Sequence, residues 1–202
     1  YHAGARHYYS VSQDDGGFSM LHEIDPSGRV EARFGLGRGF MGGLAYRDGD
    51  ESLYAIETNA EGYSRLHRIT LAGAVTSLFG VGDRVEGGLT HDPESDLFYA
   101  VANHATGKST LIRIALSGLV EPVMRLGTGV SGGLSYDAEQ RLHYFVDSDR
   151  TWFSTLRTVS LRGAVRTRLG LGPGFHAAAL ARAPAPAVPR RPGPRRLSPG
   201  IY

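Results

Sequence analysis

The chain has 202 residues, of which 41% are hydrophobic and 21% charged, and its formal net charge at pH 7 is +2, values typical of one globular domain. It contains no cysteine, which excludes a disulfide framework and a thiolate metal site. No apolar run approaches the roughly 20 residues that a transmembrane helix needs, so the sequence predicts no membrane span.

A spacing of 45 residues runs through the chain. The Gly-Leu pairs that begin at Gly43, Gly88 and Gly133 occur in the related stretches FMGGLAY, VEGGLTH and VSGGLSY. A fourth, altered copy is FHAAALA at 175–181. The same step links Tyr9, Tyr54, Tyr99 and Tyr144, and also Ser19, Ser64, Ser109 and Ser154. Self-similarity at one fixed period predicts a repeat architecture.

The expected elements are short strands. The first three cover 7–13, 19–25 and 29–35, and a complete unit of four covers 42–46, 52–58, 65–70 and 74–79. Two further units follow at the same spacing, and a lone strand is expected at 175–181. These segments are rich in β-branched and aromatic residues, and Gly or Asp separates them. Four antiparallel strands in a unit of this length indicate a propeller blade, with almost no helix.

The order of the strands predicts how the ring closes. The chain begins with the second, third and fourth strands of a blade and ends with a first strand at 175–181. If that strand joins the N-terminal three, it acts as a clasp and removes two exposed sheet edges. The sequence therefore predicts an all-β fold, a four-bladed β-propeller over 1–182 that is closed by its C-terminal strand.

Small residues are expected where the innermost strands approach the axis, and they are Gly42 and Gly43, Gly87 and Gly88, Gly132 and Gly133, and Ala177 and Ala178. The architecture resembles the four-bladed hemopexin-like propellers over residues 1–182. Domains of that family usually join their ends by a disulfide, whereas this chain has no cysteine. The resemblance implies architecture alone, with no haem-binding or ligand residue.

The loops between second and third strands are the candidate binding rim. Their polar and aromatic residues are Asp14, Asp15, Phe18, Asn59, Glu61, Tyr63, His104, Lys108, Asp149, Arg150, Trp152 and Phe153. One interpretation is that the polar residues solvate hairpin loops and the aromatic residues support each strand start. The other is a ligand-facing rim, because the connections to the central strands are expected at the same end.

The mouth of the axis is a second candidate site. Its four equivalent positions are Met41, Glu86, Ser131 and His176. An ion on the axis, held partly by backbone carbonyl groups, is one hypothesis. Two good ligands from different blades are too few for a transition-metal site, so no metal ligand, cofactor or catalytic residue is assigned. The recurrent Ser and Tyr are expected to be architectural, with Ser closing a turn and Tyr packing between sheets.

The last 20 residues differ in composition. The segment 183–202 holds six prolines and four arginines, Arg190, Arg191, Arg195 and Arg196, with Ile201 and Tyr202 at its end. Without these four arginines, 18 of the 22 basic residues remain against 20 acidic ones, so the basic character belongs to this segment. We expect an extended arm that docks on a partner through its arginines and its apolar end.

Three functional hypotheses follow. The first is a non-catalytic interaction or scaffold propeller, an accessory subunit that the arm anchors to protein partners in a larger complex. The second is a carbohydrate- or small-ligand-binding propeller, and the third is a propeller-type hydrolase or lactonase. No specific nucleic-acid binding is expected. A first residue of Tyr1 rather than Met fits a processed, extracytoplasmic protein, secreted or periplasmic.

Overall fold

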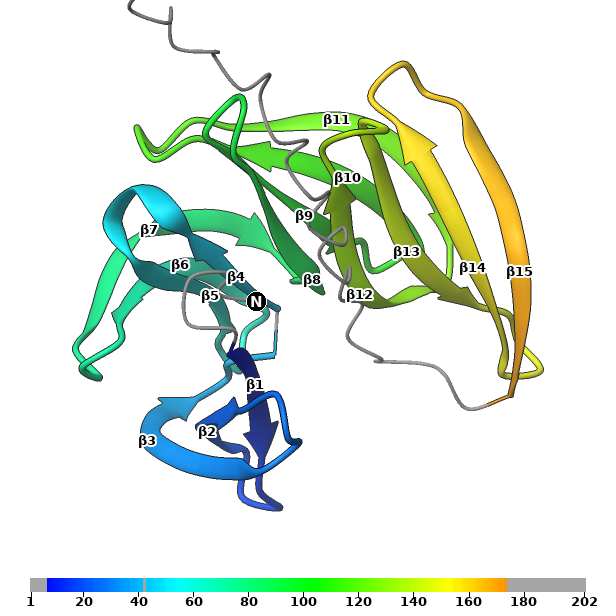
Figure 1. Cartoon of the computed structure of the whole chain (residues 1–202). Helices are drawn as coiled ribbons and strands as arrows, with labels where there is room; N and C mark the ends of the chain where they lie inside the picture. The colour runs from blue at the N-terminus through cyan, green and yellow to red at the C-terminus, as the bar shows by residue number, and fades with distance from the viewer. Residues whose placement is uncertain (1–6, 42, 174–202) are drawn as a thin grey trace, which may run out of the picture.

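The computed structural model describes residues 7–41 and 43–173, which form four small antiparallel sheets in a ring like the blades of a propeller (Figure 1). Blade 1 contains β1 (Tyr8–Gln13), β2 (Phe18–Ile24) and β3 (Val30–Arg38). Blade 2 contains β4 (Leu44–Arg47), β5 (Ser52–Thr58), β6 (Tyr63–Thr70) and β7 (Val75–Asp83). Blade 3 contains β8 (Val85–Asp92), β9 (Leu97–Asn103), β10 (Lys108–Ile114) and β11 (Val120–Thr128). Blade 4 contains β12 (Val130–Asp137), β13 (Leu142–Ser148), β14 (Phe153–Ser160) and β15 (Val165–Pro173).

The predicted repeat is confirmed in the described residues, because β5, β9 and β13 begin 45 residues apart and pair in the same way. The outer strands are longer than expected. In blade 2, register shifts at Ser64/Arg65 and Leu66/His67 allow β7 to continue to Asp83. Helix among the described residues is limited to a 3-10 turn, η1 (Asp48–Asp50), and no helix there is long and apolar enough to cross a membrane.

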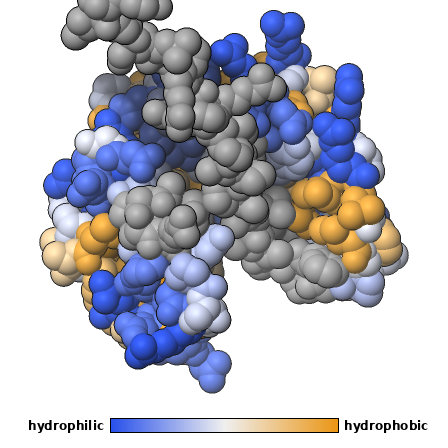
Figure 2. Space-filling model, in the orientation of Figure 1, coloured by the Kyte–Doolittle hydropathy of each residue, from blue (hydrophilic) through white to orange (hydrophobic). Residues whose placement is uncertain are grey.

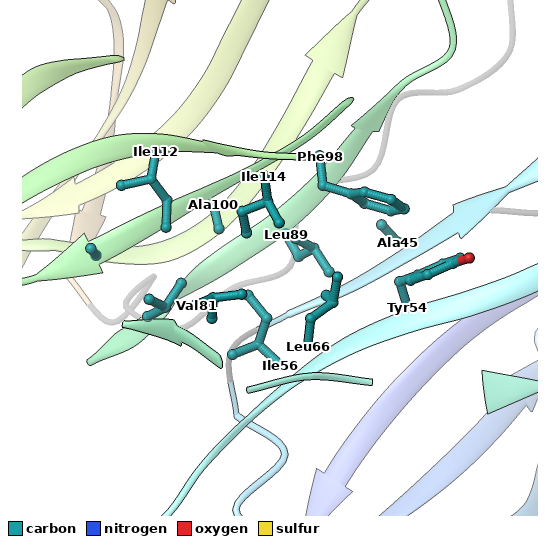
Figure 3. Close-up of a cluster of buried hydrophobic side chains, with 12 residues drawn as sticks. Ala45, Tyr54, Ile56, Leu66, Val81, Leu89, Phe98, Ala100, Ile112 and Ile114 are labelled. Carbon is teal, nitrogen blue, oxygen red and sulfur yellow. The ribbon is translucent and has the colours of Figure 1, made fainter. Parts of the chain in front are cut away.

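The hydrophobic core lies in the interfaces between neighbouring blades, which we call seams. Figure 3 shows the seam of blades 2 and 3, where Tyr54, Ile56 and Leu66 face Phe98 and Ala100. Side chains alternate along each strand, so one set faces the next blade and the other faces the previous blade. Burial of each large apolar side chain contributes about 1.5–3 kcal/mol, so the seams hold the blades together.

The predicted small residues at the axis are confirmed for Gly43 and Gly88. Both have positive φ, +95° and +96°, which disfavours any residue with a side chain. A Cβ atom at Gly43 would overlap the backbone of Gly88 and Leu89. A Cβ atom at Gly88 would lie 2.5 Å from the amide nitrogen of Leu134. The backbones of successive inner strands are therefore in direct contact.

The clasp strand at 175–181, with Ala177 and Ala178, lies outside the described residues, as do Gly42 and the arm at 183–202. Within residues 7–41 and 43–173, β1 pairs with β2 alone, so the inner edge of blade 1 has no partner strand there. Closure of the ring by the C-terminal strand stays a prediction.

Candidate functional site

The rim is the end of the propeller that carries the four hairpin loops, 14–17, 59–62, 104–107 and 149–152. The connections between blades lie at the same end, as expected. The Arg84 amide donates to the Gly62 carbonyl (2.7 Å), and the Arg84 carbonyl accepts from the Asn103 amide (2.8 Å). Equivalent bonds join Thr58 to Gly39 and Ser148 to Gly129. These bonds tie each of the three connections between blades to the end of the second strand of the following blade.

Three of the predicted polar rim residues form the turns themselves. Asp14 Oδ1 accepts hydrogen bonds from the amides of Gly16 (3.0 Å) and Phe18 (2.8 Å). Asn59 Oδ1 and Asp149 Oδ1 make the same pair of bonds in their own loops. The Thr151 hydroxyl also donates to Asp149, and these bonds lower the pKa of the Asp149 carboxyl. Asp14, Asn59 and Asp149 therefore hold the backbone of their own loops.

The recurrent aromatic residues lie over glycines of the neighbouring outer strands. The Phe18 ring covers Gly35, and the Phe153 ring covers Gly170; a Cβ atom at either glycine would approach the ring to 3.0 or 3.1 Å. Tyr63 fills the same space above Gly80. Large rings over strand glycines stabilise a pleated sheet. The three aromatic residues nevertheless remain exposed at the rim.

Blade 3 lacks this aromatic–glycine pair. Lys108 replaces the aromatic residue, and Arg125, in the position of the glycine, is also exposed. In the same loop His104 Nε2 lies 3.0 Å from Thr110 Oγ1, in place of the Asp or Asn turn. The remaining predicted rim residues, Asp15, Glu61 and Arg150, are exposed. The rim is therefore basic at blade 3 and aromatic elsewhere.

Trp152 is the rim residue that departs furthest from the repeat. Its amide bonds to the Asp149 carbonyl (3.1 Å), as the amides of Gly17, Gly62 and Gly107 do in the other loops. Those glycines have positive φ, and Trp152 has φ +63°, which a bulky side chain rarely adopts. The Trp152 side chain is 63% exposed. A large aromatic residue thus occupies a strained turn position that the repeat assigns to glycine.

The structure describes the side chains of two of the four residues at the axis mouth. Met41 is 53% exposed, and Glu86 is partly buried. Ser131 belongs to β12, and its side chain is not among those described; His176 lies outside the described residues. Residues 7–41 and 43–173 contain no group of three His, Asp or Glu side chains that could hold a metal ion. The ion on the axis therefore stays a hypothesis.

Sequence reasoning missed a charged network at the opposite end of the propeller. Arg47 at the end of β4 donates to both carboxylate oxygens of Asp96 (2.7 Å each), and His91 Nε2 lies 3.0 Å from Asp96. The hydrogen bonds from Arg47, then His91, hold the pKa of Asp96 well below its usual range. Tyr54, buried nearby, donates to Asp50 (2.6 Å), and burial followed by this bond raises its pKa to about 12. The network joins blades 2 and 3.

The recurrent Tyr and Ser are architectural, as predicted. The Tyr54 ring packs on Phe98 of the next blade, with ring centroids 4.6 Å apart. Each recurrent Ser is buried. Ser64 Oγ accepts a hydrogen bond from the Val85 amide (2.9 Å), 21 residues later, and Ser19 does the same for Phe40 (3.2 Å). The serine therefore fixes the path of the chain into the next blade.

We expect Ser64→Ala to destabilise the protein by about 1–3 kcal/mol, because it leaves the buried Val85 amide without an acceptor. Thr58 would also lose its 2.8 Å hydrogen bond to Ser64. Urea unfolding followed by tryptophan fluorescence measures the change. Ser77→Ala, on an exposed part of β7, is the control and should leave the midpoint unchanged. Equal midpoints for the two variants would contradict the architectural role.

No protein-family model matches the chain, and no curated protein matches it. Several solved structures, however, are similar to the chain. The chain is similar to a glycoside hydrolase of family GH43 engineered for endo-xylanase and exo-arabinofuranosidase activity, with a TM-score of 0.64 and 13% identity over 87% of this chain and 43% of that one. It is also similar to a chain of the nidogen/laminin complex (TM-score 0.62, 12% identity, 86% and 64% covered). A third similar structure is TolB from Acinetobacter baumannii (TM-score 0.57, 14% identity, 84% and 41% covered).

At these identities the comparisons establish the β-propeller fold alone. The chain spans between about two fifths and two thirds of the length of the structures it matches. Those structures are propellers of five or six blades, whereas the described residues of this chain form four sheets. The more specific resemblance to hemopexin-like propellers stays a prediction.

Proposed function

We propose that the protein is a non-catalytic interaction module that binds a protein partner at its rim, with Trp152 at the centre of the contact. The observation that carries the proposal is the conformation of Trp152. Positive φ at a bulky residue costs about 1–3 kcal/mol, and such strain concentrates at functional sites. The other three loops use glycine at this position, so the turn itself does not require tryptophan.

The surroundings of Trp152 support a binding role. Exposed Phe153 is adjacent, and Arg150 lies in the same loop. Trp, Tyr and Arg are the side chains that most often supply the central energy of a protein interface. The hydrogen bonds of Asp149 hold the loop in one conformation, so little entropy would be lost on binding.

The non-catalytic assignment rests on how the rim uses its polar groups. Asp14, Asn59 and Asp149 accept backbone hydrogen bonds within their turns. His67 packs on Phe40, and His143 packs between Tyr99 and Tyr136, so both of these histidines lie in seams. Both observations favour recognition over general acid–base chemistry.

The proposal includes the arm at 183–202 as a second attachment to the same partner, within an extracytoplasmic complex. Its arginines Arg190, Arg191, Arg195 and Arg196 would pair with an acidic surface, and Ile201 and Tyr202 would supply an apolar contact. Two linked contacts raise the overall affinity through effective concentration. The hemopexin-like closure by 175–181 would place the origin of the arm at the end opposite the rim, so the arm would run along the propeller to reach the same partner.

The test is Trp152→Gly, which restores the residue of the other three loops. We expect it to raise the free energy of unfolding by about 1 kcal/mol, because it relieves strain, and to abolish partner binding. Urea unfolding followed by far-ultraviolet circular dichroism measures stability. Recovery of a partner from source extract on immobilised protein, quantified by mass spectrometry, measures binding. Trp152→Tyr should keep most of the binding, and removal of 183–202 should weaken it without changing stability.

The carbohydrate-binding and hydrolase alternatives predict different results for substitutions at the rim and at the axis mouth. If Trp152→Gly destabilises the fold, or recovers the same proteins as the parent chain, the proposed contact is wrong. Binding on a glycan array that Trp152→Gly removes would favour the carbohydrate-binding alternative. Turnover of an ester or lactone that Glu86→Gln or His176→Ala abolishes, with folding intact, would favour the hydrolase alternative.

A further inference from the structure

The three seams share one construction. In each, a tyrosine of the preceding blade packs on the large residue that lies 44 positions later in the next blade. The ring centroids of Tyr54 and Phe98 are 4.6 Å apart, and those of Tyr99 and His143 are 4.5 Å apart. Tyr9 packs against the cluster that contains Leu53. We call the side of a blade that faces the next blade its forward face, and the opposite side its rear face.

The forward face of blade 4 repeats the composition of the other forward faces. Its residues Tyr144, Val146, Leu156, Leu169 and Leu171 occupy the positions of Tyr54, Ile56, Leu66, Phe79 and Val81. Leu66 is fully buried and Phe79 packs into its seam, whereas Leu156 is partly exposed and Leu169 is 58% exposed. Apolar side chains gather over the same blade in Figure 2. The face is built as half of a seam.

The rear face of blade 1 repeats the other half. Tyr8, Ser10 and Ile24 occupy the positions of Leu53, Ala55 and Ile69, so the order of a large, a small and a β-branched residue is kept. The rear faces of blades 1, 2 and 4 also carry a polar pair at the rim end. The pairs are Ser12–His22 (2.7 Å), Glu57–His67 (3.5 Å) and Asp147–Arg157 (2.9 Å).

We propose that the forward face of blade 4 and the rear face of blade 1 of the same chain form a fourth seam, in which Tyr144 packs on Tyr8. The two faces match position by position. The inner strands already touch at Gly43 and Gly88, and such close approach suits a ring of four blades. A tether within one chain also gives the two faces a high effective concentration.

Cross-linking in the full-length chain tests the partner of each face. Because the chain has no cysteine, Tyr8→Cys with Tyr144→Cys introduces the sole thiol pair. A short bismaleimide should then join the two within one chain, at a yield that does not depend on protein concentration. Each single variant is a control and should give no intramolecular product. A covalent dimer that forms more at higher protein concentration would assign the face to a second copy and overturn the proposal, as would a folded double variant without cross-linking.

A second variant keeps the proposal testable if the double variant does not fold. Leu169→Glu should lower the urea midpoint, because it places a carboxylate in the proposed seam. Leu119→Glu is the matched control, since Leu119 is equally exposed (56%) at a turn of blade 3, and its midpoint should not change. Equal midpoints for the two variants would mean that Leu169 faces water in the native protein, which would overturn the fourth seam.

Discussion

Gly88→Val is expected to remove a large part of the stability of the propeller. Gly88 has φ +96°, and a Cβ atom there would lie 2.5 Å from the Leu134 amide nitrogen and 3.0 Å from the Gly133 carbonyl carbon. Backbone atoms of the inner strands cannot move away without breaking the seam of blades 3 and 4. Overpacking costs about 1–3 kcal/mol and strained φ a similar amount, out of a total of about 5–15 kcal/mol for a typical domain.

Urea unfolding of Gly88→Val and Gly82→Val separates the two costs. Gly82 has a comparable φ of +110°, yet a Cβ atom there would meet nothing within 4 Å. The Gly82 variant should therefore show the cost of backbone strain alone, and the Gly88 variant should unfold at a clearly lower urea concentration. The same midpoint for both would mean that the inner strands are not in contact at the axis.

The regular parts of the fold could be predicted because each blade repeats the same pattern of residue types at the same spacing. The glycines at 43 and 88 and the tyrosines at 54 and 99 recur in register, so one interpretation of each position applies to every blade. The lengths of the outer strands could not be predicted, because the register shifts beside Ser64 and Leu66 depend on the pairing of two strands.

The rim could be predicted as a place but not in its details. The aromatic positions were visible in the repeat, but Phe18 lies over Gly35 only because bulges offset β2 and β3. The unusual position of Trp152 is visible in the sequence, because alignment of the four loops shows tryptophan where the other three have glycine. The network of Arg47 and Asp96 had no such signal, because the positions equivalent to Arg47 hold Asp92 and Asp137, so the pair of opposite charges does not recur in the other blades.

His143 shows how a departure from the repeat alters stability. It occupies the position of Leu53 and Phe98 and is fully buried in the seam of blades 3 and 4, between the rings of Tyr99 (4.5 Å) and Tyr136 (4.8 Å). Neither ring nitrogen has a hydrogen-bond partner among the described residues. Burial therefore lowers the pKa of His143 to about 4, although the nearby Asp92 carboxylate opposes this shift.

A lowered histidine pKa in the folded state makes stability fall with acid. Above pH 6.5, the ordinary histidine pKa, the imidazole is neutral in both the folded and the unfolded state, so its protonation does not affect the free energy of unfolding. Between pH 6.5 and about 4 the unfolded chain binds a proton that the folded protein excludes, so stability is lost. The difference between the pKa values of the unfolded and folded states corresponds to a loss of about 3 kcal/mol in the free energy of unfolding. Burial lowers the pKa of His67 as well, which adds a loss of the same sign.

We therefore expect His143→Phe, which copies the residue of blade 3, to remove most of this acid sensitivity. Phenylalanine at 143 would keep the ring contacts with Tyr99 and Tyr136 and would have no nitrogen to protonate or leave unpaired, so stability at pH 7 should be kept or increased. The measurement is the urea midpoint of parent and variant from pH 7.5 to pH 4.5. His104→Phe, at the exposed rim, is the control and should follow the parent profile. If His143→Phe loses stability with acid as steeply as the parent does, then the imidazole is already protonated in the folded protein, and a different group unfolds the propeller at low pH.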